Sequence, residues 1–182
     1  MSKDNTKLPL KRALTQDKMS AHNAKAFLIT CMDFRFINDE ISHMLEKGYD
    51  VNFDAYSMAG VSIGINQTEY PYWIKTLFDH IEISVNLHHI KKVILFDHLD
   101  CGAYKKFRPG FKTEQEERDL HIEELKIAAA KIKEKFKDLK IVCKIIHSNR
   151  NNNLEIKENA PENIYDSEPI TPIQDIQKNN VN

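Results

Sequence analysis

Three side chains of the kind that bind soft metal ions follow two apolar segments of this sequence. Cys31 comes shortly after the apolar run 26–29, and His98 and Cys101 follow the apolar run 93–96. Thiolates and imidazoles are common zinc ligands, and a set of two cysteines and one histidine leaves the fourth tetrahedral position open, as in catalytic sites. These residues indicate a catalytic rather than a structural zinc site, with one Zn²⁺ per chain.

A carboxylate and a guanidinium accompany the first cysteine. Cys31, Asp33 and Arg35 alternate along the chain, so in an extended segment their side chains point to the same side. Asp33 could take the fourth ligand position itself. Alternatively, Arg35 could hold Asp33 away from the metal by a bidentate contact, so that the carboxylate faces a zinc-bound hydroxide. In both arrangements Asp33 controls whether the metal is open to substrate.

These residues need a scaffold that brings residues 31–35 and 98–101 together. Buried or alternating apolar patterns predict strands at 25–30, 51–57, 91–96 and 139–146, and helical spacing predicts helices at 38–47, 69–88 and 113–138. We expect a loop at Gly60 and Gly64. The alternation of strands and helices favours an α/β fold, with a mostly parallel central sheet of four to five strands and helices on both faces. Ligands in such folds bind beyond the carboxyl ends of the strands, where both motifs fall.

The composition divides the 182 residues into an apolar middle and two polar ends. Residues 25–149 are expected to form the zinc-binding α/β domain. Residues 1–24 are expected to be an N-terminal arm or helix, and residues 150–182, rich in asparagine, a polar C-terminal tail.

Charge and hydropathy exclude several classes of partner. The chain has 26 Lys and Arg residues against 27 Asp and Glu residues, so it lacks the basic excess that drives nucleic-acid binding. Its apolar runs are far shorter than a bilayer span, and residues 1–12 lack the apolar segment of a secretory signal. We therefore expect a cytoplasmic protein with neither a nucleic-acid nor a membrane partner.

The remaining cysteine and histidines have simpler interpretations. Cys143 lies at an apolar position of the last predicted strand and is expected to pack in the core. No histidine outside the motif has an acidic or cysteine partner at metal-ligand spacing; these are His22, His43, His80, His121 and His147, with His88 and His89 near a helix C-terminus.

The two motifs resemble the signature of the β-class carbonic anhydrases, Cys-x-Asp-x-Arg followed by His-x-x-Cys-Gly. In this chain they read Cys31-Met-Asp33-Phe-Arg35 and His98-Leu-Asp-Cys101-Gly102. The resemblance extends over residues 26–146 and includes the dipeptide Ala59-Gly60.

This resemblance implies a zinc ion on the three soft ligands, with Asp33 and Arg35 as catalytic residues beside it. It implies the reversible hydration of carbon dioxide to bicarbonate by a zinc-bound hydroxide. It also implies a homodimer or homotetramer whose pocket lies near a subunit interface. Gly60 and Gly102 are expected to border the substrate.

Three departures from the family pattern keep other functions open. Phe34 stands where the family usually has serine, Asp97 where it usually has glycine, and Ser57-Met58 where it usually has Arg-Asn. A divergent hydrolase of carbonyl sulfide or carbon disulfide is one alternative, and a non-catalytic zinc-binding protein is a second. A metal-free cysteine hydrolase, in which His98 activates Cys31 or Cys101, is a third alternative.

Overall fold

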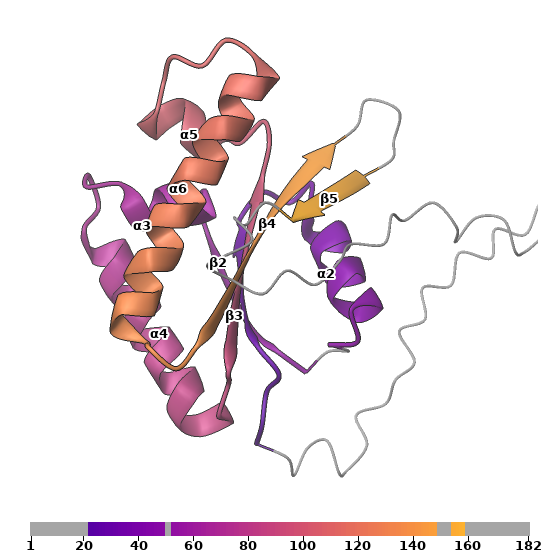
Figure 1. Cartoon of the computed structure of the whole chain (residues 1–182), viewed down its shortest axis with the longest axis vertical. Coiled ribbons are helices and arrows are strands. Elements are labelled where there is room, and N and C mark those ends of the chain that lie inside the picture. Colours follow the sequence, from indigo (N-terminus) through magenta and orange to yellow (C-terminus); the bar gives the residue numbers. More distant parts are fainter. Residues whose placement is uncertain (1–21, 50–51, 149–153, 159–182) are drawn as a thin grey trace, which may run out of the picture.

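A five-stranded sheet organises the computed structural model, which describes residues 22–49, 52–148 and 154–158 (Figure 1). The strands are β1 (Phe27–Cys31), β2 (Asp54–Met58), β3 (Lys92–His98), β4 (Lys140–Ser148) and β5 (Leu154–Glu158). The helices are α2 (Ile37–Glu46), α3 (Val61–Asn66), α4 (Tyr72–His88), α5 (Gly102–Phe107) and α6 (Glu114–Lys135). The strand order is β2-β1-β3-β4-β5. The first four strands are parallel and β5 is antiparallel to β4, which confirms the predicted α/β class.

Helices cover both faces of the sheet, and the alternation of side chains along β1 shows how. Phe27, Ile29 and Cys31 pack in one core with apolar residues of α3, α4 and α6. Leu28, together with Ala26 just before the strand, packs in a second core with Met44 of α2 and Phe36 at the start of that helix. In Figure 1, α2 accordingly lies on one side of the sheet and the other helices lie on the opposite side. Strands covered in this way read as continuous apolar runs, which is why β3 is so evident in the sequence.

The sequence prediction of a loop at Gly60 and Gly64 is wrong, because this segment contains the short helix α3. All residues from Val61 to Asn66 are buried. A buried backbone must satisfy its own hydrogen bonds, and a helix does so within the segment. Since the helix has no exposed polar face, it lacks the periodicity by which amphipathic helices are predicted.

Two further elements were not predicted, namely α5 and β5. Strand β5 lies within the expected polar C-terminal tail, and it extends the sheet at β4. Most of the expected N-terminal arm and residues 159–182 of the expected tail lie outside the described residues. The division into arm, domain and tail therefore stays a prediction.

The long helix α6 begins at a capping box. The Thr113 side chain accepts a hydrogen bond from the Glu116 backbone N–H, and the Glu116 side chain accepts one from the Thr113 backbone N–H. Such a reciprocal pair satisfies two N–H groups that a helix start otherwise leaves free. The capping box thereby fixes where α6 starts, and with it the position of its first buried side chain, Glu117.

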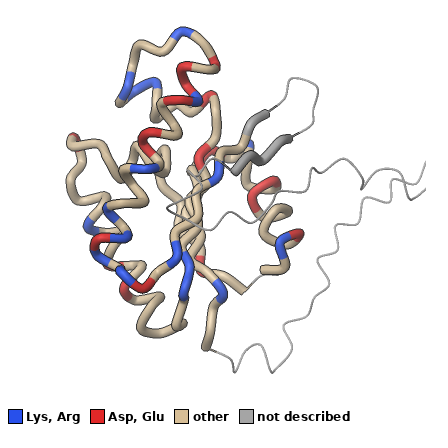
Figure 2. Tube along the Cα trace, viewed as in Figure 1, with Lys and Arg blue, Asp and Glu red and all other residues tan. Residues whose placement is uncertain are grey.

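Charged residues lie mainly on the helices and turns, with both signs interspersed, whereas the strands in the centre are mostly uncharged (Figure 2). Among the described residues, no helix combines the length and the apolar character needed to cross a membrane.

Candidate metal centre

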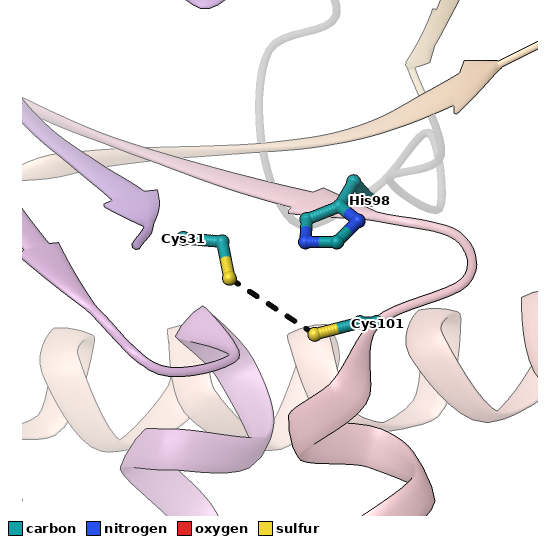
Figure 3. Close-up of side chains that lie close together, drawn as sticks. All are labelled: Cys31, His98 and Cys101. Carbon is teal, nitrogen blue, oxygen red and sulfur yellow. Dashed lines mark hydrogen bonds between the residues drawn. The ribbon is translucent and has the colours of Figure 1, made fainter. Parts of the chain in front are cut away.

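Two adjacent strands bring the three predicted ligands together at one edge of the sheet. Cys31 is the last residue of β1 and His98 is the last residue of β3, and Cys101 lies in the turn between β3 and α5. β1 and β3 are parallel neighbours, so their carboxyl ends meet. Figure 3 shows the two sulfur atoms facing one another with the imidazole beside them. All three residues are buried.

The distances between the ligand atoms fit a tetrahedral metal ion. The two sulfur atoms lie 4.0 Å apart, and one ligand atom from each residue lies within 4.8 Å of the others. Two sulfurs each bound at ~2.3 Å to a tetrahedral zinc ion are separated by about 3.8 Å. The cysteines are free rather than disulfide-bonded. No other set of at least three His, Cys, Asp or Glu residues in the described ranges has ligand atoms this close together.

The His98 imidazole is oriented as a metal ligand would be. Its Nδ1 lies 2.9 Å from the Leu99 carbonyl oxygen, so Nδ1 carries the proton and donates it there. Its Nε2 is buried and has no hydrogen-bond partner among the described residues. The ring stacks on Phe36, with the centroids 4.2 Å apart. A buried imidazole nitrogen without a hydrogen-bond partner, next to two thiols, is suited to bind a metal ion, so these residues could hold one.

The surroundings of Cys31 favour the deprotonated form of its thiol. The pKa of Cys31 is lowered, chiefly because the Cys101 thiol hydrogen-bonds to it, while the same contact raises the pKa of Cys101. The backbone N–H of Gly60 also donates to Cys31 Sγ at 3.4 Å. Since thiolates rather than thiols bind metals, both contacts favour the ligand form of Cys31.

Asp33 and Arg35 lie beside these ligands and form a close ion pair. Nε of Arg35 donates to both carboxylate oxygens of Asp33 at 3.0 and 3.1 Å, and Nη2 donates to Oδ2 at 2.6 Å. These hydrogen bonds lower the pKa of Asp33 to about 2. Oδ2 of Asp33 also lies 3.9 Å from Nε2 of His98. The carboxylate is therefore ionised and lies next to the unpaired nitrogen.

Asp100 is a second partner of Arg35 that the sequence analysis missed. Its Oδ2 accepts from Nη1 of Arg35 at 3.0 Å, and its backbone oxygen accepts from Nη2 at 3.2 Å. The sequence offered a reason to consider Asp100, because it is an interior residue of the His-x-x-Cys motif. The motif thus supplies two candidate metal ligands, His98 and Cys101, and also Asp100, which binds the guanidinium of Arg35.

The two predicted glycines differ in what surrounds them. Gly60 has φ +56°, and a Cβ added there would lie 2.6 Å from Cβ of Ala103 and 3.6 Å from Sγ of Cys101. Gly102 begins α5, and a Cβ added there would meet nothing within 4 Å. Close packing requires a glycine at the first position and leaves open space at the second.

No acidic partner at metal-ligand spacing was predicted for His121, yet two carboxylates lie beside its ring. Its Nδ1 lies 3.0 Å from Oδ2 of Asp97, and its Nε2 lies 3.8 Å from Oε1 of Glu117. Glu117 precedes His121 by four residues, a spacing that brings side chains together on a helix and could have revealed this pair.

Cys143 is buried in the core as predicted, and burial raises the pKa of its thiol to about 12.

Comparisons with known proteins identify the family of this chain. Residues 21–156 match the model of the family described as "Putative carbonic anhydrase". An uncharacterised protein of Rickettsia bellii (strain RML369-C) is 40% identical over 122 residues, which cover 66% of this chain and 74% of that protein. An uncharacterised protein of Rickettsia conorii (strain ATCC VR-613 / Malish 7) is 39% identical over 122 residues, which cover 66% of each.

A solved structure shares the fold. It comes from work on two tetrameric β-carbonic anhydrases of Sordaria macrospora, and it is 13% identical in sequence, with a TM-score of 0.54. The alignment covers 81% of this chain and 87% of that one. At this identity the likeness concerns the architecture of the chain.

Proposed function

The chain is a divergent member of the β-carbonic anhydrase family, and from this membership we propose that it is a zinc-dependent enzyme that reversibly hydrates carbon dioxide to bicarbonate. One observation carries the proposal. The buried Cys31, His98 and Cys101 place their ligand atoms within 4.8 Å of one another, and Nε2 of His98 has no other partner among the described residues. This donor set would hold one Zn²⁺ per chain, and with three protein ligands it would suit a catalytic rather than a structural role.

A zinc ion held by Cys31, His98 and Cys101 would supply Lewis acidity and with it a water-derived nucleophile near neutral pH. Asp33 accepts a hydrogen bond from the attacking water and orients it toward carbon dioxide, because its carboxylate lies next to the ligand nitrogen of His98. Arg35 keeps Asp33 ionised and fixes its orientation, since the guanidinium binds both carboxylate oxygens.

Gly60 and Gly102 are proposed to border the substrate. A Cβ at Gly60 would clash with Ala103 and Ile63 and would contact the sulfur of Cys101, whereas the space beside Gly102 is open. The open space beside Gly102 suits the approach of a small, linear molecule, and the lack of a side chain at Gly60 lets its backbone lie close to the ligand cluster.

The assembly proposed for this enzyme is a homodimer or homotetramer. The segment that carries Asp33 continues into α2 with a row of exposed apolar side chains: Met32, Phe34, Ile37, Ile41 and Leu45. An apolar row next to a site marks a surface that another chain can cover, and we assign it to a second copy of this chain. Analytical ultracentrifugation should give a multiple of the 21.2 kDa chain mass, and replacement of Ile41 by aspartate should reduce that multiple. A monomer at all concentrations would contradict this assembly.

The proposed location is the cytoplasm. It is supported by the three cysteines, all of which are free and buried, since reduced thiols persist in that compartment.

The decisive experiment combines zinc quantification with stopped-flow measurement of carbon dioxide hydration across pH. We expect one zinc per chain and hydration well above the uncatalysed rate. Stoichiometric zinc without hydration at any pH would favour the non-catalytic alternative, in which Asp33 closes the site. Turnover of carbonyl sulfide or carbon disulfide alone would redefine the substrate. Rapid alkylation of a zinc-free protein that is hydrolytically active would favour the cysteine hydrolase.

A further inference from the structure

Helix α6 holds both ends of the turn that carries two of the candidate metal ligands. Together with the last two residues of β3, this turn runs from Asp97 to Cys101. At its start, Asp97 is bound by His121 of α6, and near its end the backbone of Asp100 is bound by Glu117, one helical turn earlier. Asp97, Glu117 and His121 are all buried.

The Asp97 carboxylate joins three helices to the end of β3. Its Oδ1 accepts from the backbone N–H of Ser62 in α3 at 3.0 Å. Its Oδ2 accepts from the Tyr104 hydroxyl of α5 at 2.8 Å, from Nδ1 of His121 at 3.0 Å, and from the Ser62 hydroxyl. A carboxylate with four donors is fully satisfied although it is buried. A glycine, which the family usually has here, could make none of these bonds.

Glu117 fixes the other end of the turn through the backbone. Its Oε1 accepts from the N–H of Asp100 at 2.9 Å. Asp100 has φ +58°, a left-handed conformation that residues other than glycine rarely adopt. The same residue binds Arg35 with its carboxylate and carbonyl oxygens. Glu117 therefore fixes the backbone of Asp100, the residue of the turn that binds Arg35.

His121 connects the two anchors. Its ring stacks on Tyr104 with the centroids 3.5 Å apart, so it cannot turn freely. One nitrogen binds Asp97, and the other lies 3.8 Å from the Glu117 carboxylate. The imidazole thus binds the Asp97 carboxylate and lies beside the Glu117 carboxylate, so the residues that hold the two ends of the turn are packed together.

From these contacts we infer that Asp97, Glu117 and His121 are positioning residues for the metal centre. They set the placement of His98 and Cys101 without contacting metal or substrate. The inference rests on the proposed zinc function. Outer residues that orient metal ligands typically change metal affinity by ~10–100-fold when they are removed.

The test compares two buried glutamates of the same helix. Glu117→Ala removes the bond to the turn, whereas Glu124→Ala removes a carboxylate that binds Asn66 and Arg108, away from the turn. Zinc affinity is measured by competition with a chelator, and ligand geometry by the absorption spectrum of the cobalt(II)-loaded protein. We expect Glu117→Ala to weaken zinc binding ~10–100-fold and to shift the cobalt spectrum, with Glu124→Ala matching the unmodified chain in both.

A conservative variant separates positioning from general stability. Glu117→Gln keeps an oxygen that accepts from Asp100, so it should recover most of the zinc affinity. Asp97→Asn fills the same volume, and it should weaken zinc binding even if Glu117→Ala does not fold. Equal zinc affinity in the unmodified chain and in Glu117→Ala or Asp97→Asn would overturn the inference, as would an equal loss in Glu124→Ala.

The two proposals fail in different ways. Weaker zinc binding by Glu117→Ala in a protein that does not hydrate carbon dioxide supports the positioning role and contradicts the proposed function. Failure of the unmodified chain to bind zinc contradicts both.

Discussion

Nη2 of Arg35 lies 2.6 Å from Oδ2 of Asp33, the oxygen that also lies 3.9 Å from the ligand nitrogen of His98. The guanidinium thus holds the carboxylate next to the candidate metal centre. Replacement of Arg35 by alanine should leave zinc at one per chain and lower kcat/KM for carbon dioxide by at least ~100-fold, because Asp33 loses its orientation. Stopped-flow hydration and metal analysis of the same sample measure both effects.

The matched control for that variant is Arg118→Ala on α6, which leaves the ion pairs of Arg35 with Asp33 and Asp100 in place. It should keep both zinc and activity. If Arg35→Ala keeps full activity, Arg35 has no part in the reaction.

Removal of a thiol ligand should remove the metal. Cys101→Ala leaves only Cys31 and His98 at the centre, so zinc content should fall from one per chain to near zero. Cys143→Ala is the control, because this thiol is equally buried but lies in β4, outside the ligand cluster. It should keep its zinc and cost about 1 kcal/mol of stability at most. Full zinc occupancy in Cys101→Ala would show that the ligand set is misassigned.

The ligand cluster could be predicted from the sequence because its geometry follows from local rules. Cys31 and His98 end or follow apolar runs, and the carboxyl ends of parallel strands meet at one edge of a sheet. The contact between Asp97 and His121 could not be predicted in this way, since it depends on how α6 packs against the end of β3. Only the proximity of Glu117 and His121 could be predicted from the sequence, because residues four apart lie together on a helix.

The close approach at Gly60 predicts a cost for any side chain there. Gly60→Ala places a Cβ 2.6 Å from Ala103 at φ +56°, whereas Gly48→Ala has a similar φ of +73° and meets nothing within 4 Å. Both variants pay the left-handed backbone cost of about 1–2 kcal/mol. Gly60→Ala should lose a further ~1–3 kcal/mol through overpacking.

Urea unfolding of the two glycine variants measures this difference. Gly60→Ala should also bind zinc more weakly, because displacement of its N–H removes a donor to Cys31 Sγ. Equal stability losses in the two variants would show that the segment at Gly60 can move aside without cost.

A buried glutamate on α2 predicts how stability depends on pH. Glu40 is 3% exposed and its Oε1 has no hydrogen-bond partner among the described residues. Burial, with smaller contributions from the negative charges of Cys31, Asp39 and Asp33, raises the pKa of Glu40 from 4.5 to about 8. The folded chain therefore keeps Glu40 protonated at a pH where the unfolded chain has ionised it.

Unfolding then releases a proton between pH 4.5 and about 8, so the stability that Glu40 contributes is complete below pH 4.5 and is lost as the pH rises to about 8. Glu40→Gln stays neutral, and its free energy of unfolding should fall less over this interval, by on the order of a few kcal/mol. The exposed Glu46→Gln on the same helix is the control and should follow the unmodified chain. Urea unfolding at pH 5, 6.5 and 8 measures the free energy of unfolding of the zinc-loaded unmodified chain, Glu40→Gln and Glu46→Gln. The pH dependence of zinc binding is common to all three proteins, so it cancels in the comparison. Parallel curves for Glu40→Gln and the unmodified chain would mean that Glu40 ionises in the fold near its ordinary pKa.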